Sequence, residues 1–193
     1  VGMKTALITG ASSGFGAHFA RLAAGAGARV VLFVQSREAP DPARWDTDLL
    51  DPRAGGDAIA TTSLDPLLGR IEQGMELRFR VRGNPTRKID TKSGPDGRRR
   101  NGRRVPVRGD EARLRWLAAK LARAGMTLVG ATMTSDATQI GRPAGSPART
   151  HEAWLFDGVL RIEDPTLARG AVEAGLGPAK AYGFGLLSLA PVG

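Results

Sequence analysis

The sequence contains no cysteine and only two histidines among its 193 residues. Without thiols it can form neither a disulfide nor a thiolate metal site, and two histidines leave little for a zinc centre. No apolar run approaches the roughly 18 residues that a membrane span needs, and the N-terminus lacks the charged-then-apolar layout of a secretory signal. We therefore expect a cytoplasmic protein that holds no metal and no cofactor and has no membrane partner.

Acidic residues are scarce between residues 78 and 108, where twelve Lys or Arg stand against Asp90 and Asp96. The twelve positive and two negative charges give this stretch a net charge of +10, so it accounts for the whole formal net charge of the chain, which is +9. Such a concentration of charge predicts a polyanionic partner, with nucleic acid the first candidate. A solvated loop that aids solubility, a nucleotide partner and an acidic protein partner remain the alternatives.

From residue 75 to residue 82, at the start of this basic stretch, side chains alternate between apolar and charged, which predicts a half-buried strand with a row of arginines on its open face. The apolar members are Met75, Leu77, Phe79 and Val81. The charged members are Glu76, Arg78, Arg80 and Arg82.

From residue 75 onward the periodicity predicts elements in the order β-α-β-β-α-β, the ferredoxin-like (RRM-like) pattern of an α+β fold. A helix is expected after Asp110, which we assign as its N-cap, and Gly125 is expected to end it. A second, capped helix has Pro165 in its first turn. The basic segment, residues 83–104, is too polar to pack by itself and is expected to be a loop or hairpin that orders on its partner. The buried stripe expected on the first helix is Leu114, Leu117, Ala118 and Leu121.

The opening motif TALITGASSGFG, residues 5–16, resembles the first β-α-β unit of short-chain dehydrogenases. Gly10, Gly14 and Gly16 have the spacing that lets backbone N–H groups approach a pyrophosphate. That family needs a Tyr-x-x-x-Lys pair, but the only tyrosine is Tyr182 and the residue four positions on is Leu186. We therefore expect these glycines to be vestigial, with no bound NAD(P); a nucleotide-binding dehydrogenase fragment is the least favoured alternative.

A second glycine-rich stretch lies between the last predicted helix and the final strand. Its glycines permit a tight backbone turn and also the close approach of a phosphodiester, and the pattern alone favours neither interpretation. They are Gly175, Gly177, Gly183 and Gly185.

Five separated segments resemble, in order, the repeat-processing endoribonuclease of type I-E CRISPR systems, the Cas6e (CasE) family of Cascade subunits. The segments are LFVQSREAP (32–40), LRFRVRGNPTRK (77–88), RVPV to LRWLAAKL (104–121), LFDGVLRIEDP (155–165) and GLGPAKAYGFGLLSLAP (175–191). The resemblance implies two tandem ferredoxin-like domains that bind the stem-loop of a CRISPR repeat RNA and cut at its base. It also implies other Cascade subunits as partners.

The implied chemistry is metal-free and ends in a 2′,3′-cyclic phosphate, with a histidine near the N-terminus as general base or acid. His18 is the candidate here, although it belongs to the dehydrogenase-like stretch and not to a motif of the family. His151 matches no active-site position of the family, and we interpret it as a surface residue. A repeat-RNA binder that does not cleave is the main alternative.

The same resemblance, together with the charge pattern, assigns RNA contacts to basic side chains on the strand, in the basic segment and in the glycine-rich stretch. They are Arg78, Arg80, Arg82, Arg87, Lys88, Lys92, Arg98, Arg99, Arg100, Arg103, Arg104 and Lys180.

The expected organisation has three parts. Residues 1–32 form the dehydrogenase-like β-α-β segment, in place of the start of the first ferredoxin-like domain. Residues 33–74 are the remnant of that domain. Residues 75–193 form the second ferredoxin-like domain, which carries the basic segment.

Overall fold

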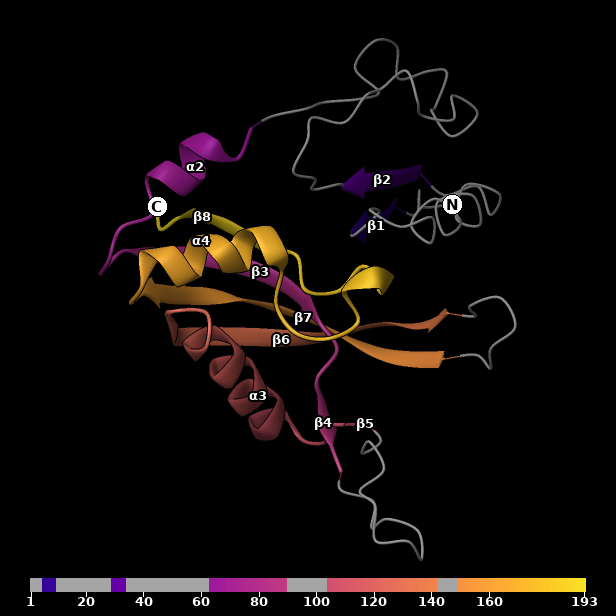
Figure 1. Cartoon of the computed structure of the whole chain (residues 1–193). Coiled ribbons are helices and arrows are strands. Elements are labelled where there is room, and N and C mark those ends of the chain that lie inside the picture. Colours follow the sequence, from indigo (N-terminus) through magenta and orange to yellow (C-terminus); the bar gives the residue numbers. More distant parts are fainter. Residues whose placement is uncertain (1–4, 10–28, 34–62, 90–103, 142–148) are drawn as a thin grey trace, which may run out of the picture. The chain divides into compact units, whose positions relative to one another are not determined.

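The computed structural model describes residues 5–9, 29–33, 63–89, 104–141 and 149–193 (Figure 1). The chain divides into two compact units, residues 1–71 with 181–183 and residues 72–180 with 184–193. None of the helices in the described ranges is long and apolar enough to cross a membrane.

In the first unit, β1 (Thr5–Thr9) pairs in parallel with β2 (Arg29–Phe33), and α2 (Asp65–Gly69) follows later in the chain. A parallel pair is the arrangement that a β-α-β unit requires. The helix predicted between these strands, with Gly10, Gly14, Gly16 and His18, lies outside the described residues, so the Rossmann-like unit stays a prediction.

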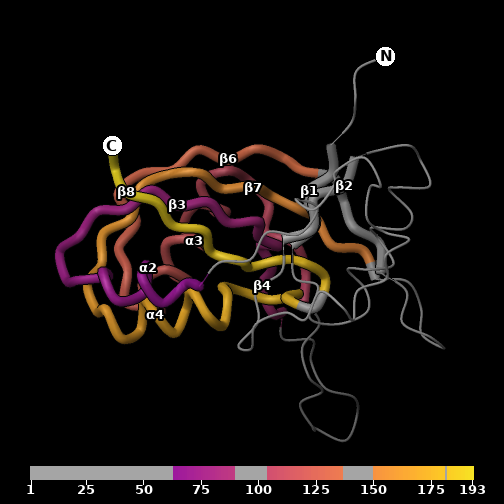
Figure 2. Tube along the Cα trace, turned by 90° about the horizontal axis from the view of Figure 1, so that it is seen from above, coloured from indigo at the N-terminus to yellow at the C-terminus, as the bar shows by residue number. Residues whose placement is uncertain are grey.

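The second unit is built on one four-stranded sheet with the strand order β6-β7-β3-β8, in which every neighbouring pair is antiparallel. The sheet strands are β3 (Glu76–Gly83), β6 (Met126–Gly141), β7 (Arg149–Ile162) and β8 (Leu187–Pro191). The two helices α3 (Asp110–Ala122) and α4 (Pro165–Ala174) lie on the same face of this sheet (Figure 2). Among the sheet strands and these two helices the chain order is β3-α3-β6-β7-α4-β8, which confirms the ferredoxin-like fold, with β7 between the parallel strands β3 and β6.

The core lies between the sheet and the two helices. On β3 burial alternates as predicted, because Leu77, Phe79 and Val81 are buried while the residues between them face away. Met75 was expected to join this row, but it lies in the turn before β3 and is 38% exposed. Other buried members are Phe156, Leu160 and Ile162 of β7, Leu117 and Leu121 of α3, Met126 of β6, and Ala168 and Val172 of α4.

The start of α3 differs from the prediction. Gly109 is the N-cap, and Asp110 is the first helical residue, whose carboxylate accepts a hydrogen bond of 2.8 Å from Arg113 Nη1. Arg113 is buried, with its guanidinium carbon 3.8 Å from the centroid of the Trp154 ring. Arg113 is buried on α3 together with Leu117 and Leu121 of the predicted stripe, whereas Leu114 and Ala118 are half-buried.

The start of α4 agrees with the predicted cap. The carboxylate of Asp164 accepts hydrogen bonds from the backbone N–H groups of Thr166 (2.9 Å) and Leu167 (3.1 Å), and Pro165 follows as the first helical residue. The cap satisfies donors that have no partner inside the helix.

Replacing this cap is expected to cost stability. Asp164→Ala should lower the free energy of unfolding by about 1 kcal/mol, because two N–H groups of α4 lose their acceptor. Asp164→Asn keeps an acceptor oxygen and should lose much less. Urea denaturation of the full chain followed by circular dichroism measures both, and equal losses in the two variants would contradict the capping role.

Candidate nucleic-acid interface

The arginine row of β3 lies on the sheet face opposite the helices, as the alternation predicts. Arg78 and Arg80 are exposed, whereas the side chain of Arg82 is only 16% exposed. The row therefore presents two open guanidinium groups and one half-buried group to the surroundings.

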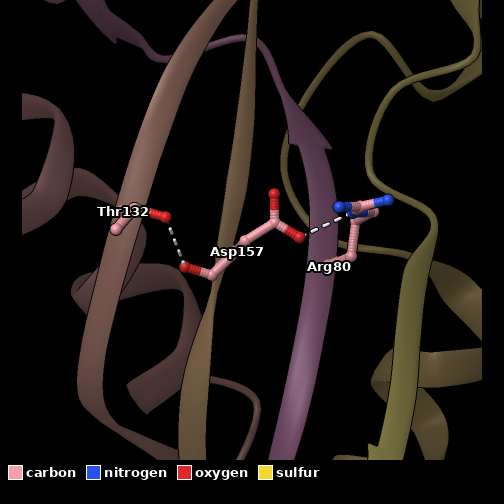
Figure 3. Close-up of polar contacts among 3 residues, drawn as sticks. All are labelled: Arg80, Thr132 and Asp157. Carbon is pink, nitrogen blue, oxygen red and sulfur yellow. Dashed lines mark hydrogen bonds and ion pairs between the residues drawn. The ribbon is translucent and has the colours of Figure 1, made fainter.

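Two arginines of this row have acidic partners from other strands, which the alternation does not reveal. Arg80 Nε donates to Asp157 Oδ1 at 2.6 Å, and Asp157 is also its register partner on β7 (Figure 3). The hydrogen bond to Asp157 raises the pKa of Arg80, and the charge of Asp157 acts in the same direction. Thr132 Oγ1 on β6 is 3.4 Å from the carbonyl oxygen of Asp157 (Figure 3).

Arg82 is held more firmly still. Its Nε donates to Asp136 Oδ2 of β6 at 2.5 Å, and its guanidinium carbon lies 4.7 Å from the centroid of the Phe184 ring. Arg78 forms no ion pair within the described ranges, and its register partners are Val159 and Ala190. Of the three predicted contacts on β3, Arg78 is therefore the cation whose charge is not offset by a neighbouring carboxylate.

The ends of the basic segment pair as an antiparallel hairpin, one of the two forms expected of it. Strand β4 (Thr86–Lys88) pairs with β5 (Arg104–Pro106) in a register that sets Arg87 opposite Val105 and Lys88 opposite Arg104. The three basic side chains are exposed, while Asn84 and Pro85 at the base are buried. The remaining predicted contacts, Lys92, Arg98, Arg99, Arg100 and Arg103, lie outside the described residues.

The glycine-rich stretch folds onto itself and onto the end of β3. Gly175, Gly177, Gly183 and Gly185 all have positive φ angles. At Gly185 a Cβ atom would lie 2.1 Å from the carbonyl oxygen of Leu176. Its N–H donates to the carbonyl of Arg82 and its own carbonyl accepts from Leu176 N–H, both at 2.7 Å. The close approach that requires glycine here is therefore to the chain's own backbone.

Sequence reasoning missed two cations near this stretch, Lys120 and Arg123 at the end of α3. Burial lowers the pKa of Lys120, and the positive charges of Arg123, Arg104 and Lys180 lower it further. Lys180, a predicted contact, is exposed in the short 3₁₀ helix Lys180–Tyr182. The only signal in the sequence was a pair of basic residues in and just after the last turn of a helix. Basic residues are common at the C-terminal ends of helices, so this signal is weak.

The two histidines have different outcomes. His18 lies outside the described residues. His151 was expected at the surface, but it is half-buried in β7, with Nδ1 2.9 Å from Asn84 Nδ2 and its ring centroid 6.0 Å from that of Phe184. The surface prediction is wrong because β7 begins at Arg149 and carries His151 into the sheet. No group of three or more His, Asp or Glu in the described part of the chain is placed to hold a metal ion.

A family model described as CRISPR associated protein matches residues 14–191. The chain therefore belongs to this family of CRISPR-associated proteins, and the resemblance to the Cas6e family is confirmed. It is 29% identical over 138 residues to the CRISPR-associated endoribonuclease Cse3 of Thermus thermophilus, covering 65% of this chain and 61% of the relative. It is 34% identical over 125 residues to the CRISPR system Cascade subunit CasE of Escherichia coli, covering 64% and 62%.

A solved structure of CRISPR endoribonuclease Cse3 bound to a 19-nucleotide RNA matches with a TM-score of 0.52 and 30% identity, covering 63% of this chain and 58% of that chain. The chain thus spans less than two thirds of the length of the two curated relatives. The family match begins at residue 14, so it includes His18 and most of the segment interpreted as dehydrogenase-like. The replacement of the family's start by residues 1–32 is not confirmed.

Proposed function

We propose that this chain binds the stem-loop of CRISPR repeat RNA and processes it, as a partner of other Cascade subunits. The single observation that carries the proposal is the β4–β5 hairpin, which presents exposed cations at both ends of the basic segment. A folded RNA stem is recognised largely through its shape and its backbone phosphates, which Arg and Lys side chains bind.

The distribution of ion pairs supports the same proposal. Within the described ranges, Arg78, Arg87, Lys88 and Arg104 form no ion pair with a carboxylate, in contrast to Arg80 and Arg82. A cation without an acidic neighbour keeps its hydrogen-bond donors for a phosphate. We therefore assign direct phosphate contacts to the hairpin and Arg78, and a supporting role to the two paired arginines.

The two curated relatives support the RNA-processing part, since one is named an endoribonuclease and the other a Cascade subunit. In metal-free cleavage the ribose 2′-oxygen attacks the neighbouring phosphorus and the bond to the 5′-oxygen breaks. A base accepts the proton of the 2′-hydroxyl and an acid protonates the leaving 5′-oxygen, which gives a 2′,3′-cyclic phosphate and a 5′-hydroxyl. His18, within the range of the family match, is our candidate for this proton transfer.

The test uses the full chain with a panel of labelled type I-E repeat stem-loops in EDTA, and scores binding and cleavage on the same samples. We expect saturable binding and one cut at the stem base that leaves a cyclic-phosphate end. His18→Ala should abolish the cut and keep binding, whereas the matched variant His151→Ala should keep both. Binding without a cut would leave a non-cleaving repeat-RNA binder, and absence of binding would overturn the proposal.

A further inference from the structure

The indole ring of Trp116 on α3 is the point where three parts of the second unit meet. A Cβ placed on Gly83, at the end of β3, would lie 3.2 Å from the Cζ3 atom of Trp116. A Cβ on Gly177, in the glycine-rich stretch, would lie 3.2 Å from Cη2 and Cζ2. One turn further along the helix, Lys120 Nζ lies 5.9 Å from the ring centroid.

This packing brings together basic side chains that are far apart in the sequence. From Gly83 the chain continues into the β4–β5 hairpin, which carries Arg104, and from Gly177 it continues to Lys180. Both residues act electrostatically on Lys120, as does Arg123 on the next turn of the chain. Arg104, Lys120, Arg123 and Lys180, named here the α3 cluster, therefore combine cations from three separate elements.

The α3 cluster has no counter-charge of its own. Within the described ranges none of its four members forms an ion pair, and every neighbouring charge that perturbs Lys120 is positive. Six other arginines of the second unit do have carboxylate partners: Arg80, Arg82, Arg108, Arg113, Arg115 and Arg161. Unpaired like charges held close together cost free energy in the unbound protein, and a bound anion removes that cost.

We propose that the α3 cluster is a phosphate-binding site for the backbone of the repeat RNA, in which Lys120 and Arg123 act together with Arg104 and Lys180. The inference rests on the proposed function and extends it from the hairpin to the end of α3. Lys120 has a double role in this site. It destabilises the free protein, because it is partly buried among like charges, and it stabilises the complex.

The test compares two double variants that remove the same charge. Lys120→Gln with Arg123→Gln removes two positive charges from the α3 cluster. Arg108→Gln with Arg115→Gln removes two arginines that already have carboxylate partners. Fluorescence anisotropy with a labelled repeat stem-loop, over a series of KCl concentrations, gives the affinity and its salt dependence. We expect the first variant to bind about 10- to 100-fold more weakly, with a salt slope lower by roughly 1 to 2, and the second to change affinity less than about threefold.

Two further readouts separate binding from folding. Lys120→Gln alone should raise the melting temperature of the free protein, whereas a merely structural side chain would lower it when removed. Lys120→Arg with Arg123→Lys keeps both charges and should retain most of the affinity. A cluster variant that binds like the control variant overturns the site while the proposed function stands.

A second probe, a twelve-nucleotide oligouridine, distinguishes failure of the site from failure of the proposed function. If the unsubstituted chain binds neither the stem-loop nor the oligouridine, both proposals are wrong. If it binds oligouridine alone and the cluster variant loses this binding, the phosphate site stands and the repeat-RNA function is overturned.

Discussion

Gly185→Ala is expected to destabilise the protein by about 3 kcal/mol or more. The residue has a φ of +87°, and its added methyl carbon would lie 2.1 Å from the carbonyl oxygen of Leu176. The obstacle is backbone, so no side-chain rotation relieves it. Moving the backbone of Leu176 away from Gly185 would break the hydrogen bonds by which Gly185 connects the glycine-rich stretch to itself and to the end of β3.

Gly170→Ala is the matched control. Gly170 lies in α4, and a Cβ placed there meets nothing within 4 Å. Alanine in a helix interior should therefore raise stability by about 0.5 to 1 kcal/mol. Urea denaturation measures both variants, and a loss below about 1 kcal/mol for Gly185→Ala would contradict the packing described for this loop.

Neutralising the basic segment is expected to weaken RNA binding at least about a hundredfold, since each lost charged contact is worth about tenfold or more. The variant replaces Arg98, Arg99, Arg100, Arg103 and Arg104 by glutamine. Each lost phosphate contact also reduces the number of counterions released on binding, so the plot of log affinity against log salt should flatten by up to about 4. Anisotropy titrations of the repeat stem-loop at several salt concentrations measure both quantities.

The control variant replaces the same five arginines by lysine. It keeps the charge and loses only the forked donor geometry, so the salt slope should stay near that of the unsubstituted chain. An unchanged slope in the glutamine variant would show that the stem is bound elsewhere on the protein.

The parts of the fold that follow from local chemistry were predictable from the sequence. The alternation from Leu77 to Val81 placed the buried and open faces of β3, and the Asp-Pro pair at residues 164–165 marked the start of α4. The start of α3 was placed one residue off, because Asp110 could cap the helix or bind Arg113 on its first turn, and only the tertiary contact with Trp154 decides between them.

The missed features of the candidate site all depend on contacts between distant segments. Asp157 forms an ion pair with Arg80 because the β3–β7 register sets them opposite each other, and the sequence of a strand alone does not fix its register. Arg104 and Lys180 join Lys120 in the α3 cluster because the end of β3 and the glycine-rich stretch both pack on Trp116. Such residues look like ordinary surface cations until the topology is known.

The position of β3 in the sheet has a consequence for local opening. From Leu77 to Val81 this strand is paired on both sides, with β7 and with β8, and its inward side chains lie in the core. Its amide hydrogens should therefore exchange with solvent only in global unfolding events, and more slowly than those of the edge strands β6 and β8. The strand that displays Arg78 and continues into the hairpin is then among the last parts of the unit to open, so its arginines keep their spacing through every smaller fluctuation.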